Sequence, residues 1–155
     1  MEQKETLVGI HVHKYGKVGP FSQKYIKILK HNNLKLVVLD INQLDFWEQV
    51  KQCTHFIFHW GGNPDHHQIA KSIMPIIEKT LNINVFPDEV TTWHHDDKIK
   101  QYYLLLNSGL PTIKSYVFWD KKFALQWIKE KADFPKVFKL TSSAGSKDVV
   151  LVRGK

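Results

Sequence analysis

Residues 134–152, FPKVFKLTSSAGSKDVVLV, contain two apolar runs joined by a loop of small residues, and this stretch decides how the rest of the chain is interpreted. Lys139 continues the alternation of Val137, Phe138 and Leu140, so we expect it at the end of a strand, where its ammonium group can face a bound polyanion. The loop has little side-chain bulk, so its backbone N–H groups and hydroxyls can approach phosphate oxygens closely. Its residues are Ser142, Ser143, Ala144, Gly145 and Ser146. The segment predicts a phosphate-binding hairpin, and an ordinary hairpin with a polar loop is the alternative.

A second lysine lies at the start of an expected helix. Asp96, Asp97 and Lys98 precede apolar residues at helical spacing, and Asn107-Ser108-Gly109 ends the pattern. A cation in the first turn is unfavourable for the helix dipole, although the two aspartates offset much of the cost. A bound anion facing Lys98 explains the lysine, and a solvated surface lysine is the alternative.

These segments follow one another in the order found in the ATP-grasp superfamily of carboxylate ligases, which the chain resembles over about residues 85–153. The family pattern has Asp-Lys at a helix start, a helix ending near Gly-Leu-Pro, a strand, a second helix, and Pro-x-Val-x-Lys before a small-residue loop. The resemblance implies that Lys98 and Lys139 bind the phosphates of ATP, and that residues 142–146 close over them. The chain is most similar to glutathione-synthetase-like and ribosomal-protein-modifying ligases of bacterial surface-polysaccharide pathways. Its loop departs from the glycine-richest versions in having Gly145 alone.

The reaction that the resemblance implies is ATP-dependent phosphorylation of a carboxylate to an acyl phosphate, followed by attack of an amine or similar nucleophile. Mg²⁺ stabilises charge on the transferring phosphoryl group. The family's acidic adenine hinge and Mg²⁺ ligands are expected beyond residue 155. We therefore expect the N-terminal part of a ligase, inactive by itself, whose acceptor is a small-molecule or glycan-linked carboxylate. The sequence identifies neither this acceptor nor the nucleophile.

Strand and helix patterns alternate through residues 1–87. Strands are expected at 6–12, 36–39, 55–60 and 84–86, and helices at 21–30, 46–51 and 65–81. This predicts an α/β chain: a small parallel Rossmann-like sheet, the pre-ATP-grasp domain, followed at residues 88–155 by an α+β N-terminal ATP-grasp lobe. Ligands of such sheets bind beyond the carboxyl ends of the strands. The resemblance implies that this domain helps to bind the acceptor substrate. The candidate residues there are His13, Tyr15, His59 and Trp60, and plain βα connections are the alternative.

The composition indicates a soluble protein, with 43% hydrophobic residues and no apolar run near the ~18 residues of a membrane span. A charged start and a lone cysteine, Cys53, favour the cytoplasm, and Cys53 is expected in the core. The net charge of +7 is spread among acidic residues without a basic run, so nucleic acid is not expected as the main ligand. The spacing of the nine histidines presents no zinc face, and no metal site is expected.

Three classes of function remain open on the sequence. The first is the ATP-dependent ligase, in which this chain provides the leading domain and first lobe. The second is a non-catalytic module that responds to nucleotide or binds a partner protein, and the third is a nucleic-acid-binding protein. A Glu and Asn pattern for Mg²⁺ downstream separates the first from the second, and salt-steep binding identifies the third. Homo-oligomer formation is left open.

Overall fold

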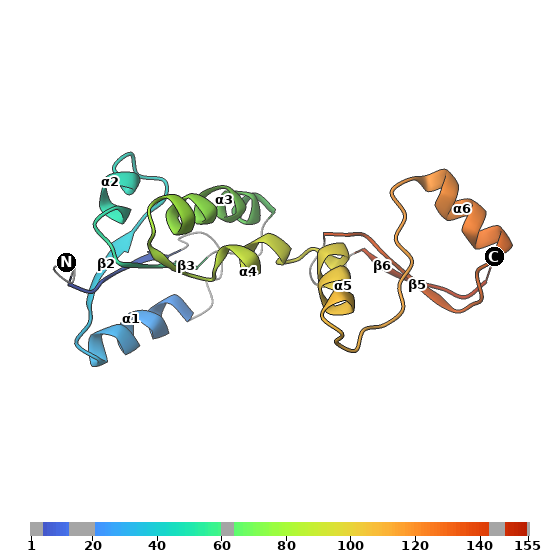
Figure 1. Cartoon of the computed structure of the whole chain (residues 1–155), viewed down its shortest axis with the longest axis horizontal. Coiled ribbons are helices and arrows are strands. Elements are labelled where there is room, and N and C mark those ends of the chain that lie inside the picture. Colours follow the sequence, from blue (N-terminus) through green and yellow to red (C-terminus); the bar gives the residue numbers. More distant parts are fainter. Residues whose placement is uncertain (1–4, 13–20, 60–63, 143–147, 155) are drawn as a thin grey trace. The chain divides into compact units, whose positions relative to one another are not determined.

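The computed structural model describes residues 5–12, 21–59, 64–142 and 148–154 (Figure 1). The chain forms two compact units, Met1–Trp93 and His94–Lys155. The predicted α/β class is confirmed, because the first unit holds a parallel sheet with helices and the second combines helices with an antiparallel pair. Within the described ranges, no helix has the length and apolar character that a membrane crossing requires.

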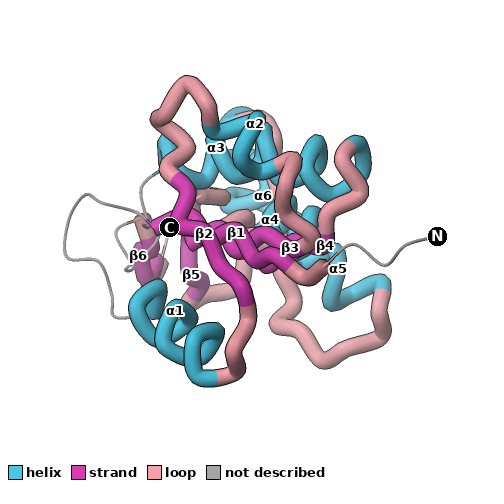
Figure 2. The backbone as a smooth tube through the Cα atoms, turned by 90° about the vertical axis from the view of Figure 1, so that its left-hand side faces the viewer, coloured by secondary structure: helices cyan, strands magenta, loops and turns pink. Residues whose placement is uncertain are grey.

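Four parallel strands form the sheet of the first unit, in the order β2-β1-β3-β4. They are β1 (Leu7–Val12), β2 (Lys35–Leu39), β3 (His55–His59) and β4 (Asn84–Phe86). Helix α1 (Phe21–His31) lies on one face, whereas α2 (Phe46–Val50) and α3 (Pro64–Pro75) lie on the other (Figures 1 and 2). These elements lie where the periodicity of the sequence predicts them.

The expected helix at 65–81 is continuous but changes its geometry. Its second part is a π-helical segment, η1 (Ile76–Thr80), which begins directly after Pro75. Proline has no N–H to donate, so the regular hydrogen-bond ladder is interrupted at this point. Helix α4 (Glu89–His94) follows β4 and leads to the second unit.

The hydrophobic core lies in the first unit, between the sheet and the helices α2 and α3. Ten buried side chains form it: Leu39, Phe46, Val50, Cys53, Phe56, Phe58, Ala70, Met74, Ile77 and Ile83. Cys53 is buried, as expected for a small core residue. Gly9 of β1 is enclosed by this core, since a Cβ atom there would lie 2.8 Å from the Cys53 sulfur and 2.9 Å from Leu39 Cδ1.

The apolar residues of α1 are buried unequally. The sequence places Phe21, Tyr25, Ile28 and Leu29 on one helical face, and of these Tyr25 and Leu29 are partly buried. Phe21 and Ile28 are each 56% exposed, whereas Ser22 is 0% exposed. The buried Ser22 hydroxyl lies at hydrogen-bond distance from His59 of β3, a contact that the apolar spacing does not predict.

The second unit contains α5 (Lys98–Asn107), α6 (Lys121–Glu130) and the antiparallel strands β5 (Lys136–Lys139) and β6 (Val149–Val152). The strand that the family pattern places between the two helices is not formed, and this expectation is wrong. Residues 112–118 pair with neither β5 nor β6. They are instead held by aromatic packing, because Tyr116 and Phe118 lie 4.4 and 5.6 Å from the Trp127 ring of α6.

Side chains of the second unit are less buried than those of the first. Neither α5 nor α6 has a buried residue. On the hairpin, Val137, Phe138, Val150 and Leu151 are each exposed by half or slightly more, and they occupy both faces of the pair. A two-stranded hairpin has little stability of its own and needs contacts with other segments.

Candidate nucleotide-phosphate site

Helix α5 begins at an aspartate cap. Asp97 has an extended backbone, and its Oδ1 accepts hydrogen bonds from Ile99 N at 3.1 Å and Lys100 N at 3.0 Å. These bonds satisfy two of the amides that the first turn of a helix leaves unpaired. Lys98 is therefore the first residue of α5, as the sequence predicts.

The start of α5 is bonded to the chain that follows β5. Lys98 N donates to Thr141 O at 3.0 Å, and Thr141 Oγ1 donates to Asp97 Oδ1 at 3.2 Å. The two segments are 44 positions apart in the sequence. The structure thus brings the backbone of Lys98 next to the residue that immediately precedes Ser142.

Lys139 is the last residue of β5 and pairs with Val149 of β6. One residue later, Leu140 N donates to Asp148 O at 3.1 Å, which closes the base of the connection between the strands. Ser142 is described and exposed. Ser143, Ala144, Gly145 and Ser146 lie outside the described residues. We predict that the ammonium groups of Lys98 and Lys139 face a common cleft beside this loop.

Asp97 is the carboxylate at the centre of this arrangement. Its partial burial raises its pKa, but hydrogen bonds from Lys100 N, Thr141 Oγ1 and Ile99 N and the charge of Lys100 lower it by more. Lys100 Nζ lies 3.6 Å from Asp97 Oδ2. The net result is a pKa below the ordinary value of 3.8, so the carboxylate is ionised at neutral pH and remains a strong acceptor.

A second polar group lies at the carboxyl ends of β1 and β3. Val12 and His59 are register partners there, and the helices that follow these two strands lie on opposite faces of the sheet (Figure 1). Such a divergence is the usual ligand position in open α/β sheets. His59 Nδ1 lies 2.7 Å from Ser22 Oγ. His13, Tyr15 and Trp60, expected at the same edge, lie outside the described residues.

Several residues of these two groups are not among the site residues predicted from the sequence. Buried His11 stacks on Phe58 at 4.9 Å between ring centroids, and its Nδ1 lies 3.3 Å from Leu39 O. Ser22 is equally buried but gives no signal, since a serine in a first helical turn usually faces solvent. Asp97 could have been recognised as a cap from its place before the apolar stripe. Its bond to Thr141 could not, because it joins distant segments.

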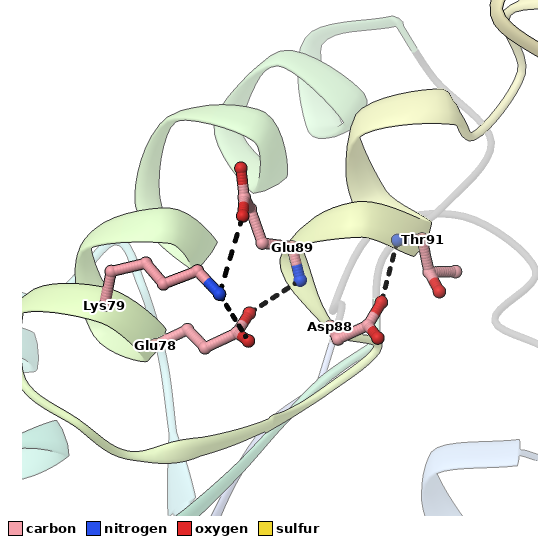
Figure 3. Close-up of polar contacts among 5 residues, drawn as sticks. All are labelled: Glu78, Lys79, Asp88, Glu89 and Thr91. Atoms are coloured by element: carbon pink, nitrogen blue, oxygen red, sulfur yellow. Dashed lines mark hydrogen bonds and ion pairs between the residues drawn. The ribbon is translucent and has the colours of Figure 1, made fainter.

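The described residues hold no group of three or more His, Cys, Asp or Glu side chains that could bind a metal ion. The resemblance places the Mg²⁺ ligands beyond residue 155, and none is assigned among these residues. The acidic residues before α4 are engaged in other bonds (Figure 3). Glu78 Oε2 accepts from Glu89 N and Asp88 Oδ1 from Thr91 N, both at 2.7 Å, while Lys79 Nζ lies 3.2 Å from Glu78 Oε1. These contacts fix the start of α4.

Two solved structures share this fold. The RimK domain protein ATP-grasp from Sphaerobacter thermophilus has a TM-score of 0.63 and 13% identity, over 96% of this chain and 54% of its own. The D-alanine–D-alanine ligase from Bacillus anthracis has a TM-score of 0.62 and 18% identity, over 97% of this chain and 50% of its own. No protein-family model and no curated protein sequence matches the chain. The chain shares the fold of the matched part of these two structures and spans about half of their length.

Proposed function

We propose that this chain provides the leading domain and the first nucleotide-binding lobe of an ATP-dependent carboxylate ligase. The observation that carries the proposal is the bonding of the Lys98 turn to Thr141, at the base of the small-residue connection. Two segments that the ATP-grasp resemblance assigns to phosphate binding are adjacent in a fold shared with ATP-grasp proteins. A boundary near residue 87 places α4 with the lobe, whereas the compact units divide after Trp93.

In this proposal the phosphates of ATP bind between Lys98, Lys139 and the connection after β5. The phosphate-binding residues of that connection are Ser142, Ser143, Ala144, Gly145 and Ser146. Charge supports this location. Residues 94–155 contain 12 Lys and Arg and 6 Asp and Glu, which gives +6 of the total +7. A positive field of this kind attracts a polyanionic ligand and raises its association rate.

The acceptor site is proposed at the carboxyl ends of β1 and β3. His13, Tyr15, His59 and Trp60 follow or end these strands, at the edge where the helices diverge. Imidazole and aromatic groups with hydrogen-bonding ability suit a carboxylate-bearing small molecule or a glycan-linked carboxylate. A cytoplasmic role in surface-polysaccharide synthesis is the setting that we propose.

Catalysis in this proposal needs Mg²⁺ ligands and an adenine hinge from further polypeptide. The resemblance places these parts beyond residue 155, and the chain spans about half the length of the two matched structures. We expect the chain by itself to bind Mg·ATP weakly, with a Kd on the order of millimolar, because few contacts must offset the ordering of nucleotide and protein. We expect no hydrolysis.

The test is an NMR titration of the ¹⁵N-labelled chain with Mg·ATP, together with a phosphate-release assay. Amide shifts should concentrate at residues 98–100 and 139–142 and should weaken steeply in Lys98→Ala and Lys139→Ala. Lys121→Ala is the matched control, because Lys121 is the first residue of α6 as Lys98 is of α5. Adenosine, which lacks phosphates, should leave these amides unshifted. Shifts confined to the first unit would contradict the proposal.

A non-catalytic nucleotide-responsive or partner-binding module is the second candidate, because the same fold and the same contact between the start of α5 and Thr141 would serve it equally well. It predicts the same nucleotide shifts but no acyl-phosphate formation when the adjoining gene segment is expressed with this chain. A nucleic-acid-binding protein would instead bind generic RNA or DNA with an affinity that falls steeply with salt.

A further inference from the structure

We infer that Asp97 and Thr141 are positioning residues that hold Lys98 in a fixed relation to Lys139. The two hydrogen bonds that join them are named here the clasp: Lys98 N to Thr141 O and Thr141 Oγ1 to Asp97 Oδ1. The inference rests on the proposed function, since it assigns a role within the same phosphate site. It adds two residues that touch neither phosphate nor substrate.

The geometry of the clasp restrains both segments. One bond uses the backbone of Thr141 and the other its side chain, so the two bonds together fix distance and orientation. Lys98 is adjacent to one clasp residue, Asp97. Lys139 precedes the other, Thr141, by two positions and is held in the β5–β6 pair. Lys98 and Lys139, the two lysines proposed to bind phosphate, are thus each linked to the clasp through at most two residues of backbone.

Helix capping alone does not account for this arrangement, because α6 provides an internal comparison. Asp120 caps α6 with the same extended backbone, and its Oδ1 accepts from Lys122 N at 2.7 Å and Phe123 N at 3.3 Å. A lysine, Lys121, follows it as Lys98 follows Asp97. The two caps differ in one respect. Among the described residues, Asp97 also accepts a hydrogen bond from a distant segment, through Thr141, and Asp120 does not. The additional bond exists where the lysine is proposed to bind phosphate.

The negative charge of Asp97 in the clasp is paired with Lys100. Lys100 Nζ lies 3.6 Å from Asp97 Oδ2, and both side chains are mostly shielded from solvent. A carboxylate beside a phosphate site would otherwise repel the ligand. Lys100 offsets that repulsion while Asp97 keeps its acceptor atoms directed to α5 and Thr141.

A double-mutant cycle tests positioning against a merely structural role. Thr141→Val keeps the size of the side chain and the capping bonds of Asp97 but removes the Oγ1 donor, whereas Thr141→Ser restores it. We expect Thr141→Val to weaken Mg·ATP binding about five- to tenfold, and Thr141→Ser to bind as the parent does. If the clasp positions Lys98, the loss caused by Lys98→Ala will be smaller in the Thr141→Val background than in the parent chain.

The outcomes separate this inference from the proposed function. If Lys98→Ala and Lys139→Ala leave Mg·ATP binding unchanged, or the parent chain shows no Mg·ATP-dependent shift, the proposed function fails and the clasp loses its role. If the lysines matter but their effects simply add to that of Thr141→Val, the positioning role alone is overturned.

A measurement on the unaltered chain guards against a variant that does not fold. The Lys98 amide should exchange with solvent more slowly than that of Lys121, since the former donates to Thr141 O and the latter is the matching amide of α6. Equal exchange would show that the clasp does not persist in solution, which also overturns the inference.

Discussion

Ser22 Oγ and His59 Nδ1 lie 2.7 Å apart and join the first turn of α1 to the carboxyl end of β3. Thirty-seven positions separate the two residues in the sequence. The serine is fully buried and the histidine is partly buried, so the bond both orients α1 and fixes the ring at the edge where we propose the acceptor site.

Replacement of Ser22 by alanine should therefore destabilise the chain. The change removes a buried hydrogen bond and leaves His59 with one partner fewer, so we expect a loss of about 1–2 kcal/mol in the free energy of unfolding. Urea denaturation followed by fluorescence measures it. Ser72→Ala is the control, because Ser72 also lies in a helix but is exposed and bonds within its own helix. Equal effects of the two changes would refute the assigned role of Ser22.

Gly9→Ala should be destabilising for a different reason. The new methyl would lie 2.8 Å from the Cys53 sulfur and 2.9 Å from Leu39 Cδ1, so the core must shift. Overpacking of this kind costs about 1–3 kcal/mol, which thermal and urea unfolding can measure. Gly154→Ala, with no atom within 4 Å of the added carbon, should leave stability unchanged. A neutral Gly9→Ala would mean that the sheet and core are less closely packed than described.

The contribution of Asp97 to the free energy of unfolding should depend on pH. Its folded-state pKa is lowered, so its contribution is complete above the ordinary pKa of 3.8 and is lost as the pH falls through the lower folded value. Asp97→Asn should thus be less stable than the parent chain near neutral pH, and the difference should vanish in strong acid. Carboxyl NMR titration and urea unfolding at several pH values check this. An Asp97 that titrates at or above 3.8 would contradict it.

Lys139→Ala should impair nucleotide use in an active polypeptide that contains this chain and the adjoining segment. Loss of a charged phosphate contact should cost on the order of 1.5–3 kcal/mol, seen as a raised KM for ATP and a lower kcat. Lys131→Ala, which removes an exposed lysine at the end of α6, provides the control. Unchanged ATP kinetics would remove Lys139 from the site.

The parts of the structure that the sequence predicted are those controlled by local pattern. Apolar periodicity located the four strands and the helices α1, α2 and α3, and Asp-Lys located the start of α5, whereas α4 was not predicted. Position within an element was less predictable. Ser22 is fully buried with its hydroxyl bonded to β3, whereas Phe21 of the apolar stripe is 56% exposed.

Contacts between distant segments could not be predicted. The bond from Thr141 to Asp97 depends on how the hairpin and α5 pack, which no periodicity records. The prediction of a strand before α6 is wrong for a related reason. A segment forms a strand only where a neighbouring strand offers backbone N–H and C=O groups for pairing. Residues 112–118 have no such partner among the described elements and use aromatic packing instead.

The β5–β6 hairpin has a consequence for solubility. Two strands with apolar side chains on both faces offer unpaired edges to any neighbouring chain, and such edges promote aggregation. Lys136 and Lys139 stand at the two ends of β5, where charged groups discourage edge-to-edge pairing. Lys139 would then protect the chain from self-association in addition to its proposed role in phosphate binding. A neutral replacement there can precipitate the protein before any loss of nucleotide binding is seen, whereas Lys139→Arg keeps the protective charge.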